Sequence, residues 1–211
     1  MMGGKLITFE GIDGCGKTSQ LRLLAGYLTE RGIPFVATRE PGGTLLGRTV
    51  RGAILDSDPG TVEPLAELLL YAADRAQHVR RVVLPALIAN RLVLSDRFYD
   101  ATTAFQGYGR CFDLALVDHL NELATGGLKP YLTLVFDLDV STALDRVTQR
   151  GRQAHPDRLD LEPIEFHERV RKGYLEIAAH EDGRVRVIPA DGSEATIHQL
   201  VIETIQPLLD E

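Results

Sequence analysis

Gly-Ile-Asp-Gly-Cys-Gly-Lys-Thr, at residues 11–18, is the stretch of sequence that decides the fold of this chain. It matches the pattern G-x-x-x-x-G-K-[ST] at every fixed position. The glycines let a turn expose consecutive backbone N–H groups to phosphate oxygens, and the following helix contributes the positive end of its dipole. Lys17 can reach the outer phosphates of a nucleoside triphosphate, and the Thr18 hydroxyl can bind Mg²⁺. The segment therefore predicts a phosphate-binding loop between a strand and a helix.

Short apolar runs before and after this loop are typical of buried strands. They occupy residues 6–9, 35–38, 92–95, 132–136 and 185–188. Helical patterns separate these runs, and parallel strands need such crossover connections. We therefore predict an α/β chain with a P-loop NTPase fold, in which a five-stranded parallel sheet is flanked by helices on both faces.

Proline, glycine and capping residues indicate where the helices begin and end. An apolar stripe over 21–28 marks the first helix, and Pro64 begins a long helix that Pro85 kinks or divides. Further helices are expected over 114–125, from the N-cap Ser141 towards Arg150, after Pro163, and after the N-cap Ser193. No linker or internal repeat divides the chain, so residues 1–211 are expected to form a single domain.

Composition and charge restrict the kinds of partner that this chain can have. It carries 23 basic and 30 acidic side chains, which give a net charge of −7. This balance argues against a nucleic-acid surface, which is normally basic, but it permits a phosphorylated small molecule held by a few arginines. The N-terminus shows no secretory-signal pattern, and no apolar stretch approaches about 20 residues. We therefore expect a cytoplasmic location without a membrane span.

Three segments near the ends of the expected strands could hold a second phosphorylated ligand. Residues 38–44 form an arginine-containing, glycine-rich loop, while Tyr71 and Arg75 lie four residues apart on one side of a helix. Asp96 and Arg97 end a strand, and the planar fork of arginine suits phosphate. Each segment also has a structural interpretation. The loop arginine could form a surface ion pair, Tyr71 could belong to the core, and Asp96–Arg97 could be a local salt bridge.

A basic, glycine-punctuated segment over about residues 146–160 is typical of a lid that closes over a nucleotide. Its arginines are Arg146, Arg150, Arg152 and Arg158. Cationic side chains that arrive when a lid closes neutralise the charge on a transferring phosphoryl group. The alternative interpretation is an ordinary solvated basic turn.

The phosphate loop alone does not define a reaction, because regulatory ATPases and signalling GTPases share it. The chain lacks the Asn-Lys-x-Asp segment that reads guanine, which disfavours a GTPase. A second set of phosphate-binding groups favours transfer to an acceptor over a regulatory ATP-binding module. A kinase for another nucleoside monophosphate, or for a deoxynucleoside, stays open as an alternative.

With these motifs in this order, nearly the whole chain resembles the thymidylate kinase family, which converts dTMP to dTDP with ATP in dTTP biosynthesis. The resemblance rests on residues 9–18, 38–44, 72–78, 96–98, 104–107, 120–125 and 157–160. Gly14 in the loop, together with an arginine-rich lid, resembles the bacterial type; other members place an arginine in the loop and few basic residues in the lid. The resemblance further implies Mg²⁺ as cofactor, no nucleic-acid or membrane partner, and a homodimer.

The resemblance also implies a role for individual residues. ATP would contact Gly11, Ile12, Asp13, Gly14, Cys15, Gly16, Lys17, Thr18 and Arg146. The acceptor dTMP would contact Asp13, Arg39, Pro41, Tyr71, Arg75, Arg97, Thr102, Phe105 and Gln106. Catalysis would depend on Lys17, Arg97, Arg150, Arg152 and Asp13. Thr18 and Asp96 would organise Mg²⁺.

Several positions depart from the family pattern. Tyr71 stands where phenylalanine is usual, and Phe105 stands where tyrosine is common, so a hydroxyl that could sense the 2′ position of the acceptor is missing. Cys15 replaces a common alanine, and a thiol among the loop amides suggests a lowered pKa and sensitivity to oxidation. A disulfide between Cys15 and Cys111 would be unusual in a chain of this type.

Overall fold

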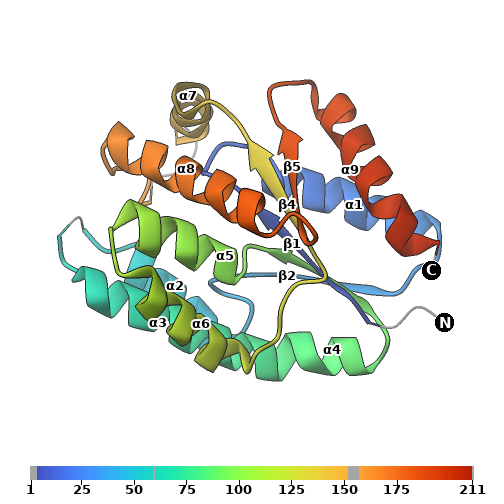
Figure 1. Ribbon diagram of the computed structural model, residues 1–211, viewed down its shortest axis with the longest axis horizontal. Helices are drawn as coiled ribbons and strands as arrows, with labels where there is room; N and C mark the ends of the chain where they lie inside the picture. Colours follow the sequence, from blue (N-terminus) through green and yellow to red (C-terminus); the bar gives the residue numbers. More distant parts are fainter. Residues whose placement is uncertain (1–3, 59, 152–156, 211) are drawn as a thin grey trace.

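Five parallel strands form the central sheet of the computed structural model, which describes residues 4–58, 60–151 and 157–210 (Figure 1). The strands are β1 (Leu6–Glu10), β2 (Phe35–Arg39), β3 (Leu92–Asp96), β4 (Leu132–Asp137) and β5 (Val185–Pro189). Their order in the sheet is β2-β3-β1-β4-β5. The strand runs and the parallel sheet predicted from the sequence are confirmed.

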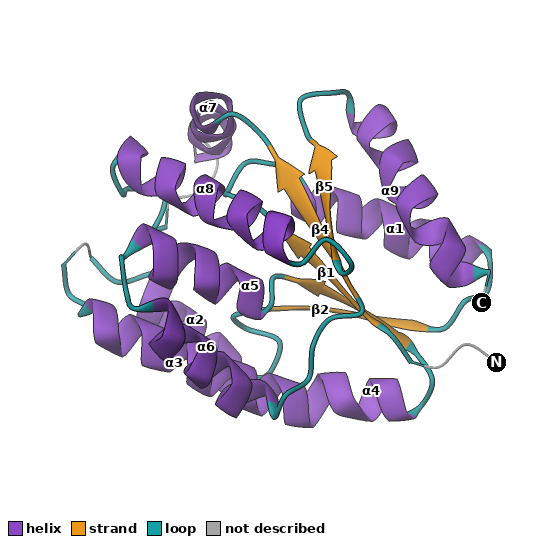
Figure 2. Ribbon diagram, viewed as in Figure 1, coloured by secondary structure: helices purple, strands orange, loops and turns teal. Residues whose placement is uncertain are grey.

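Helices connect the strands and cover both faces of the sheet (Figure 2). They are α1 (Lys17–Glu30), α2 (Leu45–Leu55), α3 (Pro64–His78), α4 (Leu84–Ile88), α5 (Tyr99–Thr102), α6 (Leu114–Thr125), α7 (Val140–Gly151), α8 (Ile164–His180) and α9 (Glu194–Leu209), with π-helical segments η1 (Val79–Val83) and η2 (Thr103–Gly109). Helices α1 and α9 lie together on one face, and α3, α4, α5 and α8 lie on the other. No helix within the described ranges is long and apolar enough to cross a membrane.

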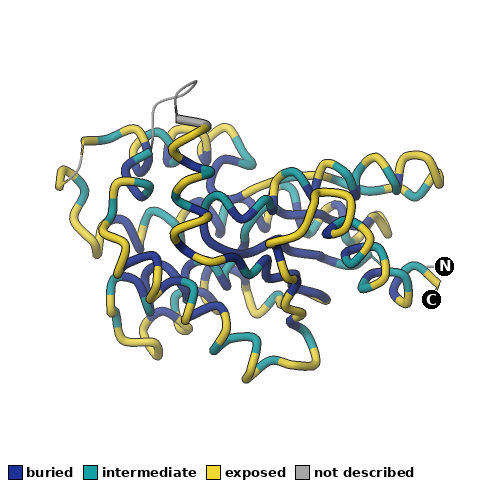
Figure 3. The backbone as a smooth tube through the Cα atoms, turned by 90° about the horizontal axis from the view of Figure 1, so that it is seen from above, coloured by how far each residue is buried: buried dark blue, intermediate teal, exposed yellow. Residues whose placement is uncertain are grey.

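Two covered faces explain why the inner strands are buried along nearly their whole length instead of alternating between buried and exposed residues. Every residue of β1 is buried, and the buried stretches in Figure 3 concentrate in the strands at the centre of the molecule. Ile7 and Phe9 belong to the larger core cluster, which also contains Leu24 of α1. Leu6 belongs to a second cluster with Val83 of η1 on the other face.

One helix boundary differs from the sequence-based expectation, and another agrees with it. Ser141 was the predicted N-cap of α7, but Asp139 is the cap, because its Oδ1 accepts hydrogen bonds from the backbone N–H groups of Ser141 (3.0 Å) and Thr142 (3.3 Å). Pro85 was expected to kink or divide a helix, and it does follow a π-helical segment that separates α3 from α4. Proline lacks an N–H group and crowds the preceding turn, which a wider π-turn accommodates.

Helix α2 follows the glycine-rich loop, where the sequence predicted only a loop. It begins after Thr44, whose Oγ1 accepts a hydrogen bond from the N–H group of Gly47 (2.9 Å). Val50 and Ile54 anchor α2 in the core. Glycine is a poor helix former, so Gly47 and Gly52 weaken the helical pattern of this segment in the sequence.

The carboxyl ends of three strands lie at one edge of the sheet. In the strand register, Asp96 of β3 lies opposite Phe9 of β1 and Arg39 of β2. The phosphate-binding loop after β1, the glycine-rich loop after β2 and the Asp96-Arg97 pair therefore share this edge. Ligands of parallel α/β sheets bind beyond the carboxyl ends of their strands, so the candidate site lies here.

Candidate active site

The phosphate-binding loop runs from the end of β1 into the first turn of α1. Gly16 is the N-cap of α1 with a φ of 94°, and no side chain caps the helix within the described residues, so its first N–H groups can bind an anion. Gly14 has a φ of 87°, and a Cβ atom there would lie 2.2 Å from the Ala143 carbonyl oxygen of α7. Only glycine fits at this position, so the loop carries no cationic side chain there.

Lys17, Asp13 and Arg97 form a charged cluster at the mouth of the loop. The Lys17 Nζ lies 3.1 Å from Asp13 Oδ1, and Arg97 Nη2 donates to the same oxygen at 2.9 Å. Burial by itself would raise the pKa of Asp13, but the charges of Arg97 and Lys17 outweigh it and hold that pKa well below its usual range. Asp13 therefore stays ionised and keeps both cations beside the loop.

The residues expected to organise a metal ion lie together. The Thr18 hydroxyl at the start of α1 donates to Asp96 Oδ2 at 2.6 Å. A hydroxyl and a carboxylate are hard oxygen ligands of the kind that Mg²⁺ prefers. Among the described residues, no group of three His, Cys, Asp or Glu side chains could hold a metal by itself. The pair therefore fits an Mg²⁺ ion that takes its other ligands from phosphates and water.

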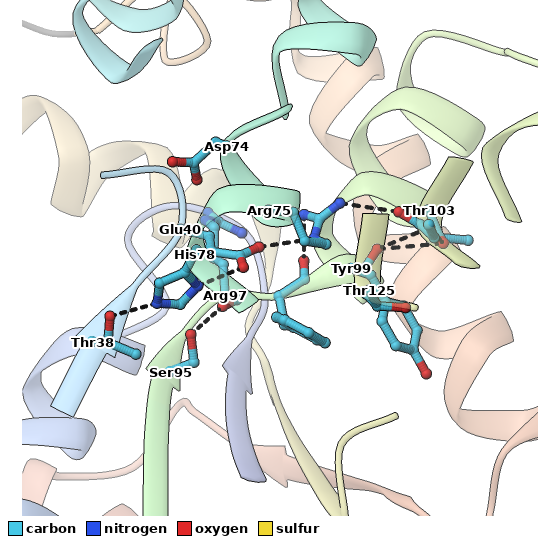
Figure 4. A network of polar contacts seen from close by, with 12 residues as sticks. Thr38, Glu40, Asp74, Arg75, His78, Ser95, Arg97, Tyr99, Thr103 and Thr125 are labelled. Carbon is cyan, nitrogen blue, oxygen red and sulfur yellow. Dashed lines mark hydrogen bonds and ion pairs between the residues drawn. The ribbon is translucent and has the colours of Figure 1, made fainter. Parts of the chain in front are cut away.

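Arg97 lies between the phosphate-binding loop and a separate cavity that it lines, hereafter the second cavity. Its φ of 72° is left-handed, a strained conformation for a residue with a side chain, and Ser95 Oγ donates to its carbonyl oxygen at 2.7 Å (Figure 4). Its Nη1 donates to the Gly11 carbonyl and to the Tyr174 hydroxyl, both at 3.0 Å. The guanidinium also lies 4.7 Å from the Phe105 ring centroid. These contacts fix its orientation.

Glu10 supports Arg97 from behind. One of its carboxyl oxygens accepts the Phe98 N–H group at 2.7 Å, and the other lies 2.8 Å from the Tyr174 hydroxyl. Burial, reinforced by the nearby charge of Asp100, raises the pKa of Glu10 to about 8. A neutral carboxyl group therefore lies behind Arg97 at neutral pH.

The difference in the free energy of unfolding between Glu10→Gln and the wild type is expected to shift in favour of the variant as the pH rises. The Glu10 pKa is about 8 in the folded chain and near 4.5 when unfolded. The stability contributed by the neutral carboxyl is therefore complete below pH 4.5 and lost as the pH rises through 8. Glutamine stays neutral, so its advantage in the free energy of unfolding should grow by about 3 kcal/mol between pH 6 and pH 9.

Urea denaturation of both proteins at pH 6 and pH 9 measures this difference. Glu30→Gln, at an exposed position of α1, is the matched control and should show no pH-dependent gain. An equal difference at both pH values for Glu10→Gln would contradict the assignment of a buried neutral carboxyl.

The second cavity brings together most of the residues predicted for the acceptor. Its lining is formed by Asp13, Glu40, Pro41, Arg51, Leu55, Tyr71, Arg75, Arg97, Phe98, Ala101, Thr102, Phe105, Gln106, Asp157 and Leu159. Arg39 is not among these residues and is exposed at the end of β2. Arg51 of α2 lines the cavity instead, with Nη1 donating to the Pro41 carbonyl at 3.3 Å. Arg51 was not predicted because α2, which carries it, was expected to be a loop.

An apolar ring and polar groups converge in this cavity. Phe105 is buried, Tyr71 is half-buried, and burial raises the pKa of the Tyr71 hydroxyl above its usual value of 10, so it stays protonated. The Thr102 hydroxyl is buried and has no hydrogen-bond partner among the described residues. A buried polar group without a partner is costly, so a ligand that binds Thr102 would relieve this cost.

Arg75 is held more firmly than its sequence pattern suggested. It is 1% exposed, and its Nε donates to Glu40 Oε2 at 2.8 Å. Its Nη1 donates to Asn121 Oδ1 at 3.0 Å and its Nη2 to the Phe98 carbonyl at 3.2 Å (Figure 4). A guanidinium has five N–H donors, so two of them stay available for a ligand in the cavity.

A larger cavity of about 490 Å³ lies on the other side of the phosphate-binding loop. Its lining is formed by Gly14, Cys15, Gly16, Ser19, Gln20, Arg146, Gln149, Gly192, Glu194 and Ile197. Arg146 of α7 is therefore beside the loop, as predicted for a donor-nucleotide contact, and it donates to the Ala190 carbonyl at 3.5 Å. The segment after β5 was not predicted to line this cavity, because its place near the phosphate-binding loop depends on the order of the strands in the sheet.

Of the four arginines in the predicted lid segment, Arg146 and Arg158 have side chains that the structure describes. The Arg150 side chain and Arg152 lie outside the part of the chain that is described. Arg158 is 6% exposed, donates to the Ile54 carbonyl at 2.9 Å and forms an ion pair with the buried Glu67. The inclusion of Arg158 among the free cations of the lid was wrong, because Glu67 neutralises it and ties the end of the lid to α3.

The sequence-based hypothesis of a reactive Cys15 was also wrong. The thiol is 1% exposed, and burial raises its pKa despite the nearby charge of Lys17. A buried thiol with a raised pKa is a poor nucleophile. Cys15 and Cys111 are both free, one buried and the other exposed, so they form no disulfide.

The loop, the Thr18–Asp96 oxygen pair and the arginine-lined second cavity are the features expected of a P-loop phosphotransferase. Residues 9–201 match the family model for thymidylate kinase. The chain belongs to the thymidylate kinase family.

Curated relatives and solved structures agree with this assignment. The thymidylate kinase of Geotalea uraniireducens (strain Rf4) is 51% identical over 194 residues, which cover 90% of each chain. That of Trichormus variabilis (strain ATCC 29413 / PCC 7937) is 44% identical over 211 residues, covering 100% of this chain and 99% of the relative. The crystal structure of thymidylate kinase from Ehrlichia chaffeensis aligns with a TM-score of 0.78 at 38% identity, covering 97% of this chain and 99% of that one.

Proposed function

We propose that this protein transfers the γ-phosphoryl group of ATP to dTMP, giving dTDP and ADP for dTTP biosynthesis. The observation that carries the proposal is the position of Arg97. Its guanidinium lines the second cavity and donates to the Gly11 carbonyl of the phosphate-binding loop. It can therefore contact the phosphate of a monophosphate acceptor and the transferring phosphoryl group together, and phosphoryl transfer depends mainly on such positioning and charge neutralisation.

The donor ATP is assigned to the 490 Å³ cavity and the phosphate-binding loop. The loop N–H groups and Lys17 would hold its phosphates, with Arg146 beside the base. Thr18 and Asp96 would hold Mg²⁺, which supplies charge neutralisation to the phosphate oxygens when bound. Asp13 keeps Lys17 and Arg97 in place at the point where the two substrates meet.

The acceptor dTMP is assigned to the second cavity. Arg97 and Arg51 would hold its phosphate, and Arg51 takes the part that the resemblance gave to Arg39. Tyr71 would stack on thymine, while Arg75 and Thr102 supply hydrogen-bonding groups for its edge. Pro41, Phe105 and Gln106 would complete the walls around the base and the sugar.

A coupled assay that offers dTMP, dUMP, dGMP, AMP and thymidine in turn tests the acceptor. A clear preference for dTMP supports the proposal, and a clear preference for any other acceptor would overturn it. Thymidine lacks the phosphate that Arg97 would bind, so it should be a very poor substrate. Activity with thymidine comparable to dTMP would favour a nucleoside kinase.

A homodimer is proposed on the strength of an exposed apolar face over α2, α3 and α6, which lie side by side in Figure 1. Its leucines are Leu45, Leu46, Leu65, Leu69, Leu116 and Leu123. Leu123 is 70% exposed. Contiguous exposed apolar patches mark interaction surfaces, and a second copy of the chain would cover this one.

The predicted cytoplasmic location stays a prediction.

Leu123→Glu is expected to convert the protein from a dimer to a monomer of about 23 kDa, because a charge at the centre of an apolar contact is costly. Light scattering on the purified proteins measures the mass. Ile88→Glu, on the exposed side of α4, is the matched control and should stay dimeric. A wild-type chain that is monomeric at micromolar concentration would contradict the proposal.

A further inference from the structure

A buried chain of polar contacts runs from the end of β2 to the wall of the acceptor cavity (Figure 4). It begins at Thr38, whose Oγ1 lies 2.7 Å from His78 Nε2. His78 Nδ1 lies 2.7 Å from Glu40 Oε1, and Glu40 Oε2 accepts the Nε–H group of Arg75 at 2.8 Å. Of these residues the proposed reaction uses Arg75, and it gives no role to Thr38, His78 or Glu40.

The chemistry of the contacts fixes the tautomer and the orientation of His78. A carboxylate can only accept, so the Nδ1 atom of His78 carries the hydrogen that faces Glu40. The side chains of His78 and Glu40 are 0% and 2% exposed, so no water competes for these contacts. With one oxygen bound to His78, the carboxylate of Glu40 presents its other oxygen to Arg75 in one orientation.

His78 also lies against the loop that follows β2. A Cβ atom on Gly43 would lie 2.6 Å from His78 Cδ2, so the loop backbone packs directly on the imidazole ring. Glu40 and Pro41 of the same loop line the acceptor cavity. The imidazole therefore joins this loop to α3, the helix that carries Tyr71 and Arg75.

We propose that His78 is a positioning residue of the acceptor site, which orients Glu40 and thereby holds Arg75 in place for the base of the nucleoside monophosphate. This inference rests on the proposed function, because it assigns Arg75 to acceptor binding. It predicts that replacing His78 changes the binding of the acceptor and leaves the binding of ATP unchanged. None of Thr38, His78, Glu40 and Arg75 lines the donor cavity, and their side-chain hydrogen bonds among the described residues go to other parts of the chain than the phosphate-binding loop.

Substitution of His78 by asparagine or by glutamine can distinguish this positioning role from simple core packing. The amide nitrogen of asparagine lies the same number of bonds from Cα as Nδ1 of histidine, and that of glutamine lies the same number as Nε2. His78→Asn therefore keeps a donor for Glu40 and loses the contact with Thr38. His78→Gln reaches towards Thr38 and loses the donor for Glu40. A role through Glu40 predicts that only the glutamine variant fails.

The test is steady-state kinetics of the full chain with dTMP and ATP, together with thermal melting. For His78→Gln, the KM for dTMP is expected to rise about tenfold or more, with the KM for ATP unchanged and kcat within about threefold. For His78→Asn, the KM for dTMP should stay within about threefold of the wild type. Equal KM values for the two variants, or parallel losses in both substrates and in Tm, would overturn the proposal.

Arg75→Ala, measured alongside, separates failure of this inference from failure of the proposed function. An unchanged KM for dTMP in Arg75→Ala would remove Arg75 from the acceptor site and overturn the role of His78, whereas the proposed function would be overturned only by a preference for another acceptor. A raised KM in Arg75→Ala with a normal His78→Gln variant would overturn the role of His78 alone.

Thr38→Val keeps the test decisive if His78→Gln does not fold, because the substitution preserves shape at a half-buried position. It should raise the KM for dTMP about two- to threefold in the wild type and have no effect in the His78→Asn background, where the contact is already absent. An equal increase in both backgrounds would overturn the proposal.

Discussion

Arg97→Ala is expected to lower kcat for phosphoryl transfer about 10³-fold, with the KM for ATP little changed. Arg97 is the described cation that lines the acceptor cavity and also donates to the phosphate-binding loop, so its charge faces the line along which a phosphoryl group would move. The negative charge of that group becomes spread over its oxygens during transfer, and a fixed guanidinium stabilises it without reorganisation. ATP keeps the loop N–H groups and Lys17, which explains the small effect on its binding.

Single-turnover and steady-state kinetics measure this effect, with ATP binding followed separately by calorimetry. Arg22→Ala, an exposed arginine of α1 outside both cavities, is the matched control and should behave as the wild type. Thermal melting checks that the variant is folded, because Arg97 also pairs with Asp13. A kcat within tenfold of the wild type in a folded variant would contradict the role assigned to Arg97.

The double variant Arg150→Ala with Arg152→Ala is expected to lower kcat about 10²-fold and to change the KM for ATP by less than about threefold. Gly14 cannot carry a side chain, so Lys17 is the cation that the loop itself supplies. Arg158 is neutralised by Glu67, and Arg146 donates to the Ala190 carbonyl beside the donor cavity. Among the lid arginines, Arg150 and Arg152 are then the ones left to add their charge to that of Lys17 and Arg97 at the transferring group.

Pre-steady-state kinetics separate the transfer step from ATP binding in this double variant. Arg22→Ala with Arg81→Ala removes two exposed arginines elsewhere and controls for the change in net charge. Near-normal kcat in the lid variant would show that the neutralising charge comes from another part of the chain. A large rise in the KM for ATP with unchanged kcat would limit the two arginines to nucleotide binding.

The features that the sequence predicted correctly are those with a local cause. The strands are apolar runs that both faces of the sheet bury, and the loop between β1 and α1 depends on glycines within a few residues of Lys17. The position of Thr18 beside Asp96 followed from strand ends that meet at one edge. In each case, neighbouring residues in the chain carry the information.

The features that the sequence analysis missed depend on distant residues. Arg51 is in the cavity and Arg39 is outside it because α2 forms and turns its arginine towards Pro41. Arg158 is in a basic segment of the sequence but is paired with Glu67 of α3. Cys15 is in a loop of phosphate-binding amides, but its thiol faces the core.

By itself, the sequence determined a phosphate-binding loop at residues 11–18, a parallel sheet behind it, and a set of arginines at one edge. Only the tertiary structure decided which of these cations face a cavity and which are neutralised. The physical reason is that backbone conformation follows from local propensity and periodicity, whereas burial, ion pairing and pKa depend on partners far along the chain. Gly14 shows both the local and the tertiary influence. Its backbone conformation is local, but a side chain is excluded there because the Ala143 carbonyl of α7 lies too close.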